Sequence, residues 1–210
     1  MDRTDRKEEI FRAIWQILDE KDIDSLTIRE IAQRCNLHAN TVGYYFTSKD
    51  DMLLKFHTHI MGLDDAGRPD YFHDIPAGMH PALAVAGIVD YTIFHSDRIS
   101  PARFKLNRYL IPRMKDNESI KRHIVDNQDL MFCNYREILM KYAAAGYVIE
   151  ESVDDAICDL FIVSEGYGIQ TYFSYDSRYL DKTMSYQSLR IKENLLKPEY
   201  HHLIERNIGK

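Results

Sequence analysis

Several patterns that mark other classes of protein are missing from this sequence. Its three cysteines, Cys35, Cys133 and Cys158, are odd in number and widely spaced, which fits neither a disulfide framework nor paired zinc ligands. Thiols of this kind are typical of a reducing compartment, so we expect a cytoplasmic protein. No run approaches the roughly 18 apolar residues of a membrane span, and the charged N-terminus has no signal-peptide core. No membrane partner is expected.

The patterns of common catalytic and cofactor sites are also missing. The sequence contains no HExxH, no paired CxxC and no glycine-rich phosphate loop, so we expect no cofactor, no catalytic residue and no bound metal. Two histidine pairs come nearest to a metal site: His57 with His59, and His73 with His80. Side chains two residues apart on a helix point away from each other. The sequence therefore favours a protein that is not an enzyme, and a histidine-based metalloenzyme is kept as an alternative.

The sequence also lacks a general excess of positive charge. The 210 residues are 45% hydrophobic and 29% charged, enough for a sizeable core, and their net charge is −6. This balance argues against a protein that coats nucleic acid. Residues 25–49 nevertheless carry Arg29, Arg34 and Lys49 against Glu30, a local charge of +2. Any DNA binding must therefore be local.

Around this basic segment, residues 26–54 carry the sharpest local signals. Thr27 and Glu30 form a capping box, which predicts a helix that begins at Ile28. Asn36 ends it, because Asn tolerates the left-handed backbone of a helix stop. A second helix of about two turns fits Ala39 to Tyr45.

The next helix is opened by Ser48 with Asp51. Two short helices joined by a tight turn form a helix-turn-helix unit, whose second helix lies in the DNA major groove. We therefore predict a DNA-reading motif.

These residues resemble the N-terminal domain of the TetR family of bacterial transcriptional regulators over residues 5–56. The similarity is carried by Leu26 to Ala32, by Thr41 and Val42, by Tyr44 to Phe46, and by Ser48 to Leu53. Beyond residue 56 it lies only in length and helix layout. The resemblance implies a double-stranded DNA operator and an unknown small-molecule effector as partners, and a repressor that the effector releases from DNA.

Carried over residue by residue, the resemblance implies eight DNA contacts. Arg29 and Asn40 suit the edges of guanine and adenine, and Thr41 can contact thymine. Tyrosine and lysine side chains suit phosphate, which fixes register without reading sequence. The implied contacts are Thr27, Arg29, Ala39, Asn40, Thr41, Tyr44, Tyr45 and Lys49.

This sequence departs from the family pattern at two of its motif positions. His38 stands where the family often has a serine cap, and Gly43 where it commonly has a phosphate-binding tyrosine. Tyr44 is the candidate to replace the contact missing at Gly43. Tyr45 and Phe46 also suit core positions, so Tyr45 has two open interpretations.

All strong periodicity in the chain has the helical repeat, so we predict an all-α fold. The resemblance implies that residues 1–50 form a three-helix DNA-binding domain with its helix-turn-helix, and residues 51–210 a larger helical ligand-binding and dimerisation domain. The breaker-rich stretch 62–81 is predicted irregular, either a mobile loop or a lid in which Tyr71, Phe72 and His73 close over a ligand. By the resemblance, homodimerisation uses helices near 152–174 and 182–196.

Ligand-binding candidates are polar or aromatic residues on the inward stripes of the middle helices, because ligand pockets are mostly apolar with a few convergent polar groups. Arg108 could hold an anion and Glu165 a cation, so the charge of the effector stays open. A helical protein without DNA binding remains the other alternative function. The candidates are His57, Tyr91, His95, Phe104, Arg108, Gln128, Met131, Tyr135, Phe161 and Glu165.

Overall fold

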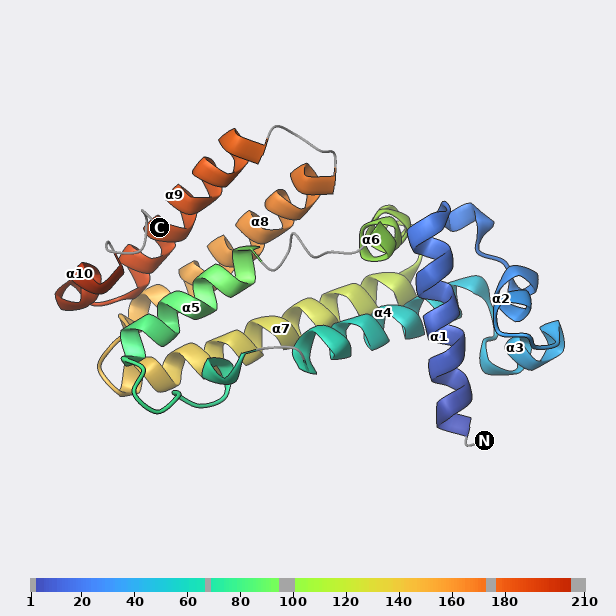
Figure 1. The fold of residues 1–210 in the computed structure, drawn as a ribbon, viewed down its shortest axis with the longest axis horizontal. Coiled ribbons are helices and arrows are strands. Elements are labelled where there is room, and N and C mark those ends of the chain that lie inside the picture. Colours follow the sequence, from blue (N-terminus) through green and yellow to red (C-terminus); the bar gives the residue numbers. More distant parts are fainter. Residues whose placement is uncertain (1–2, 67–68, 95–100, 173–176, 205–210) are drawn as a thin grey trace. The chain divides into compact units, whose positions relative to one another are not determined.

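A computed structural model describes residues 3–66, 69–94, 101–172 and 177–204 of the chain (Figure 1). Apart from one antiparallel bridge between Val148 and Leu196, the regular elements of these residues are helical. The predicted all-α fold is confirmed. The helices are α1 Arg3–Glu20, η1 Ile23–Ser25, α2 Ile28–Arg34, α3 Ala39–Tyr45, α4 Lys49–Ala66, η2 Asp70–Phe72, α5 Pro81–Phe94, α6 Pro101–Arg113, α7 Glu118–Ala144, η4 Glu150–Ser152, α8 Val153–Tyr172, α9 Ser177–Leu195, η5 Pro198–Tyr200 and α10 His201–Ile204.

The helices pack into two compact units. Unit 1 comprises residues 1–67 and 99–126, and unit 2 comprises residues 68–98 and 127–210. Helices α4 and α6 both pack with α1, which places them in unit 1. The boundary between the two packing units therefore differs from the division expected at residue 50. That division concerns which residues bind DNA and which bind a ligand, and it stays a prediction.

The core of unit 1 is built from apolar side chains of α1, α2, α3, α4, α6 and the start of α7. Phe11 lies at its centre, with ring centroids 5.8 Å from Phe56 and 6.1 Å from Phe46. Burying an aromatic or branched side chain contributes about 1.5–3 kcal/mol. This core fixes the positions of the two short helices of the motif.

The predicted boundaries of the motif are confirmed, because local capping sets them. The Thr27 hydroxyl accepts from the Glu30 amide at 3.2 Å, and α2 begins at the next residue. Asn36 adopts a left-handed φ of 52°, which turns the chain toward α3. Ser48 accepts from the Asp51 amide at 3.0 Å where α4 begins.

In unit 2, α5, α8 and α9 run side by side and pack against the second half of α7 (Figure 1). Small residues line α5, and Ala82, Ala84 and Ala86 are buried there. Their size allows neighbouring helices to approach closely. Two polar contacts join α5 to α9, since the buried Ser188 and the half-buried Lys192 both donate to Asp90 at 2.6 Å.

One expected boundary outside the motif differs in the structure. Helix α9 begins at Ser177 rather than near 182. After Lys197 the chain forms the two short helices η5 and α10, and Ile204 is buried. These segments pack through tertiary contacts that a capping pattern does not encode.

The stretch 62–81 is less irregular than predicted. Helix α4 continues to Ala66, and η2 occupies residues 70–72. Phe72 is buried against the core, with its ring 5.8 Å from that of Tyr135. The side chain of Tyr71 lies outside the described part of the structure. Within the described residues, no helix is long and apolar enough to cross a membrane.

Candidate functional site

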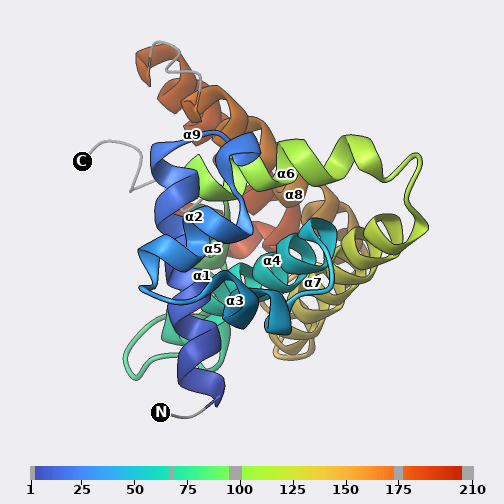
Figure 2. The same cartoon turned by 90° about the vertical axis from the view of Figure 1, so that its right-hand side faces the viewer.

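The motif helices α2 and α3 pack through their apolar faces and leave the outer face of α3 exposed (Figure 2). Ile31, Ala32 and Val42 are buried between them and α1. Ala39 and Asn40 are exposed at the start of α3, and Tyr44 is 73% exposed near its end. Thr41 is half-buried. The outer face therefore presents an amide and a phenol side by side.

Arg29 differs from its charged neighbours in α2. Its guanidinium is exposed and has no hydrogen bond or ion pair with any described residue. Arg34, in contrast, binds both carboxylate oxygens of Glu20, and Glu30 accepts from Lys21 at 2.7 Å. Among the charged groups of α2, Arg29 is thus available for an external partner.

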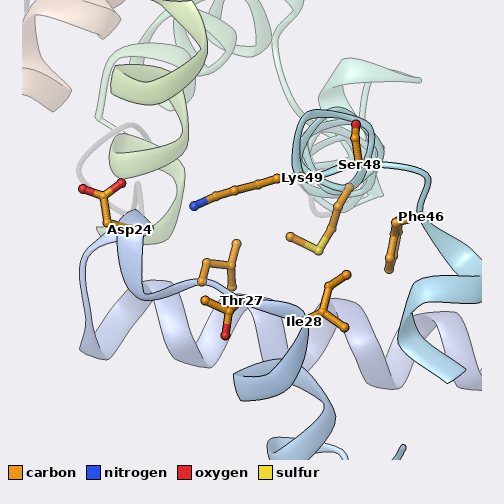
Figure 3. A pocket seen from close by; sticks show the side chains of 8 residues that line it. Asp24, Thr27, Ile28, Phe46, Ser48 and Lys49 are labelled. Atoms are coloured by element: carbon orange, nitrogen blue, oxygen red, sulfur yellow. The ribbon is translucent and has the colours of Figure 1, made fainter. Parts of the chain in front are cut away.

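The residues expected to contact phosphate are less uniform. The hydroxyl of Thr27 caps α2 and is exposed, whereas Tyr45 is half-buried against the core of unit 1. Lys49 extends across a hollow of about 250 Å³ between η1 and α4 (Figure 3). Its ammonium donates to the carbonyl of Ile23 at 2.8 Å and lies 5.5 Å from the centre of the Tyr109 ring.

Position 43 leaves room for a side chain. A Cβ added at Gly43 would meet no heavy atom within 4 Å, and the residue is exposed. Glycine here is therefore not required by contacts inside the protein. Its neighbour Tyr44 packs edge-on against Tyr45, with ring centroids 5.7 Å apart.

Two charged side chains join the start of α4 to the end of α3. Lys55 donates to the carbonyl of Tyr45 at 3.2 Å and to Asp51 at 2.9 Å. Asp51 accepts from the amide of Thr47 at 2.8 Å, and these contacts with Lys55 and Thr47 lower its pKa despite the opposing effect of burial. The position of α3 is therefore tied to that of α4.

Helix α6 is held against α1 and α4 by contacts that the sequence did not reveal. Lys105 donates to the carbonyls of Leu18 and Lys21, at 2.7 and 3.0 Å. Asp19 accepts from the amide of Ala102 at the start of α6. Residues more than 80 positions apart form these bonds, and no local spacing predicts them.

Residues 10–56 match the sequence profile of the bacterial regulatory proteins of the tetR family. The chain carries a TetR-family DNA-binding domain. This match covers the helix-turn-helix and the first part of α4, and thus includes all eight residues expected to contact DNA. No curated protein matches the chain in sequence.

Solved structures extend the likeness to the TetR fold as a whole. A regulator from Saccharomonospora viridis in complex with choline has a TM-score of 0.74 at 16% identity, covering 93% of this chain and 100% of that one. A TetR regulator from Haloarcula marismortui gives 0.71 at 18% identity, covering 92% and 100%. A TetR-family regulator from Mesorhizobium loti gives 0.68 at 15%, covering 94% and 100%. At these identities the likeness concerns the fold.

The ligand candidates expected from the sequence fall into both units. His57, Phe104 and Arg108 belong to unit 1, and the remaining described candidates to unit 2. The expected inward orientation is wrong for three of them, since Arg108, Gln128 and Glu165 are exposed on their helices. His95 lies outside the described residues. The unit 2 candidates are Tyr91, Gln128, Met131, Tyr135, Phe161 and Glu165.

Four aromatic residues in unit 2 form a connected group around Tyr135. Its ring meets those of Phe72 and Phe161 edge-on, and Phe72 also packs against Tyr91 at 5.3 Å. The Tyr135 hydroxyl lies 2.9 Å from that of Thr92. We call Phe72, Tyr91, Tyr135 and Phe161 the aromatic group. Tyr91 and Phe161 are its more accessible members.

Unit 1 contains a pair of histidines in contact, His57 and His123. Only His57 was among the ligand-binding candidates expected from the sequence. His57 of α4 and His123 of α7 have ring nitrogens 3.1 Å apart, and His57 is only 8% exposed. Burial, together with His123 and Arg103, lowers the pKa of His57 to about 4. Among the described residues, no group of three or more His, Cys, Asp or Glu side chains is placed to hold a metal ion.

The helices expected to form the dimer interface expose large apolar side chains. Ile162 and Ile169 of α8 are 72% and 45% exposed, and Tyr179 and Tyr186 of α9 are 76% and 60% exposed. Large exposed apolar side chains on two adjacent helices are typical of an interaction surface. These four residues are called the α8–α9 patch.

Proposed function

We propose that this chain is a dimeric, cytoplasmic transcriptional regulator that binds a DNA operator through α3 and leaves it when a small molecule binds unit 2. The exposed face of α3 beside the unpaired Arg29, within the matched TetR-family domain, carries the proposal. An external partner that uses these groups must offer hydrogen-bond acceptors and negative charge. DNA offers both.

The proposed contacts divide by chemistry. Arg29, Asn40 and Thr41 read base edges, with Ala39 close to them. Thr27, Tyr44 and Tyr45 contact phosphate and fix the register. Lys49 can join them, because an ammonium has three donors and the Ile23 carbonyl takes one of them.

A dimer supports this function because one two-turn helix makes few base contacts. Two copies of α3 double these contacts when their half-sites lie roughly 34–36 Å apart. The α8–α9 patch supplies apolar area for such a pairing. Replacing Ile162 and Tyr186 with Glu should give a folded monomer in sedimentation. A persistent dimer would exclude this surface as the interface.

The DNA proposal is tested with Asn40→Ala. On duplexes from the flanks of the protein's own gene, we expect binding to weaken by about 1–3 kcal/mol, with relaxed sequence preference. Binding to random duplexes should change little. Equal losses on both would contradict a base-reading role for Asn40. Gln33→Ala, on an exposed position of α2 outside the expected contacts, is the control.

Lys49→Ala separates phosphate contact from base reading. We expect weaker binding to every sequence alike and a smaller dependence of affinity on salt. Because Lys49 also bonds to Ile23, the variant's thermal stability must be measured alongside. A loss of sequence preference would assign Lys49 a base contact instead.

For the effector, the aromatic group of unit 2 favours a cation. Aromatic faces attract quaternary ammonium groups, and the S. viridis structure of similar fold contains choline. We therefore expect choline or tetramethylammonium to raise the melting temperature and weaken DNA binding. The neutral isostere 3,3-dimethylbutanol should do neither. Equal effects of choline and its isostere would exclude recognition of the charge.

A variant localises this effect. Phe161→Leu keeps an apolar side chain in the half-buried position but removes the ring that meets Tyr135. The shift caused by choline should shrink in this variant while DNA affinity without effector stays unchanged. An unaltered shift would place the cation elsewhere.

A further inference from the structure

The His57–His123 contact joins two helices of unit 1 by a bond that requires a particular protonation state. The Nδ1 atom of His57 and the Nε2 atom of His123 are 3.1 Å apart, with the rings inclined at 73°. Two neutral imidazoles form such a bond when one nitrogen donates its proton and the other accepts. If both rings are protonated, both facing nitrogens are donors and the bond is lost.

We propose that this pair is a proton-sensitive contact between α4 and α7, through which acidification loosens α4 and weakens DNA binding. The DNA part rests on the proposed function, whereas the loosening of α4 does not. This role of His57 is separate from the ligand contact that was expected for it from the sequence.

The charged surroundings of the pair determine the direction of the effect. From α6, Arg103 acts against a positive His57, and from α7 Asp126 favours a positive His123. On the neighbouring face of α4, His59 lies 3.5 Å from Glu8 of α1. Burial is the largest influence on both members and lowers the pKa of each. A second positive charge beside Arg103 is therefore the unfavourable state.

Linkage converts this into a pH window. The pKa of His57 falls from an ordinary value of 6.5 to about 4 on folding, so the neutral pair stabilises the fold fully above pH 6.5. That stability is lost progressively as the pH falls toward 4. From pH 7.5 to 5.0, the His57 contribution should raise the unfolding constant about 30-fold.

A short route connects the pair to α3. His57 follows Lys55 by two residues on α4, and Lys55 donates to the last carbonyl of α3, that of Tyr45. Asp51 of the same helix holds the amide of Thr47 just after α3. A shift of α4 therefore acts directly on the segment that ends the DNA-reading helix.

The first experiment measures stability in the full-length protein without DNA. Trp15, the only tryptophan, lies in α1 and packs edge-on against Phe56, so its fluorescence reports on unit 1. Urea unfolding at pH 7.5 and 5.0 is compared for wild type, His57→Gln and the control His59→Gln. His57→Gln should lose the roughly 30-fold effect of pH, and His59→Gln should keep it. Equal pH dependence of wild type and His57→Gln would overturn the proposal.

If His57→Gln does not fold, imidazole NMR titration of the wild type decides. A His57 resonance that titrates well below 6.5, together with a change at His123 over the same range, supports a coupled pair. Independent titration at ordinary values overturns it.

The DNA arm uses a duplex selected from a random pool for binding at pH 7.5. Acidification to pH 5.5 should reduce the affinity of the wild type relative to His57→Gln. If stability depends on the pair but relative affinity does not, the contact stands and its link to DNA fails. If no duplex is selected, the proposed function fails, while the stability result still decides the contact.

Discussion

Different kinds of contact between helices stand out inside unit 1 and inside unit 2. In unit 1, lysines of α4 and α6 donate to backbone carbonyls of other elements, as Lys49 does to Ile23 and Lys105 to Leu18 and Lys21. In the described part of unit 2, aromatic and aliphatic side chains pack between the helices around the aromatic group, and the polar contacts of Ser188 and Lys192 with Asp90 join α9 to α5.

This difference matches the demands of the proposed function. A charged hydrogen bond to a carbonyl has a defined direction and length, so it fixes where a helix lies. Aromatic packing has less directional restriction and can rearrange around a ligand. A DNA-binding unit needs fixed helix positions, whereas a ligand-sensing unit must change conformation when its ligand binds. The following changes test how far the contrast extends.

The largest effect is expected in the core of unit 2. Tyr135→Ala removes a side chain that is 5% exposed and meets two other rings, and should cost about 3–5 kcal/mol in unfolding free energy. Circular dichroism during urea unfolding measures this. Tyr135→Phe removes only the hydroxyl contact with Thr92 and should cost about 1 kcal/mol. Equal costs would show that the hydroxyl, and not ring packing, dominates.

A smaller effect is expected from one polar contact in unit 1. Lys105→Met keeps the apolar stem but removes the ammonium that binds two carbonyls at the end of α1, and should cost about 2 kcal/mol. Trp15 fluorescence during urea unfolding measures the change. Lys121→Met, at an exposed position of α7, should cost less than about 0.5 kcal/mol. If both variants cost the same, the contrast between the units fails.

The sequence was sufficient for unit 1 where structure is set locally. The bounds Ile28–Arg34 and Ala39–Tyr45 follow from Thr27, Asn36 and the apolar spacing, because a cap acts within three residues of itself. The match to the family profile extends that success to the DNA-reading motif. The eight proposed contacts remain predictions.

The sequence was insufficient where partners are distant along the chain. His57 and His123 are 66 residues apart, and nothing in the spacing around either one identifies the other. The burial of Ile204 near the end of the described residues likewise depends on packing against distant parts of unit 2. Arg108 and Gln128 were expected to face inward but are exposed. Helical periodicity shows which residues share one face of a helix, but it does not show whether another helix packs against that face.

A further test of unit 1 concerns its local capping. Thr27→Ala removes the acceptor for the Glu30 amide and should lower the unfolding free energy by about 1 kcal/mol. Thr27→Ser keeps that acceptor and should restore most of the loss. Affinity for random duplexes separates the two roles of Thr27. A stable Thr27→Ser variant with wild-type affinity, beside a weak Thr27→Ala variant, is expected if the hydroxyl also meets phosphate.

The smallest effect is expected at Gly43, and it has opposite signs for stability and DNA binding. Glycine inside a helix costs roughly 1 kcal/mol relative to alanine, and a Cβ at this position meets no protein atom within 4 Å. Gly43→Ala should therefore raise the unfolding free energy by up to about 1 kcal/mol. If α3 approaches the DNA backbone at this position, the added methyl group weakens binding to every duplex although the protein is more stable. Gel-shift affinity of Gly43→Ala and Tyr44→Phe on one duplex measures this. Unchanged affinity for Gly43→Ala beside a loss for Tyr44→Phe would place the phosphate contact on the hydroxyl of Tyr44.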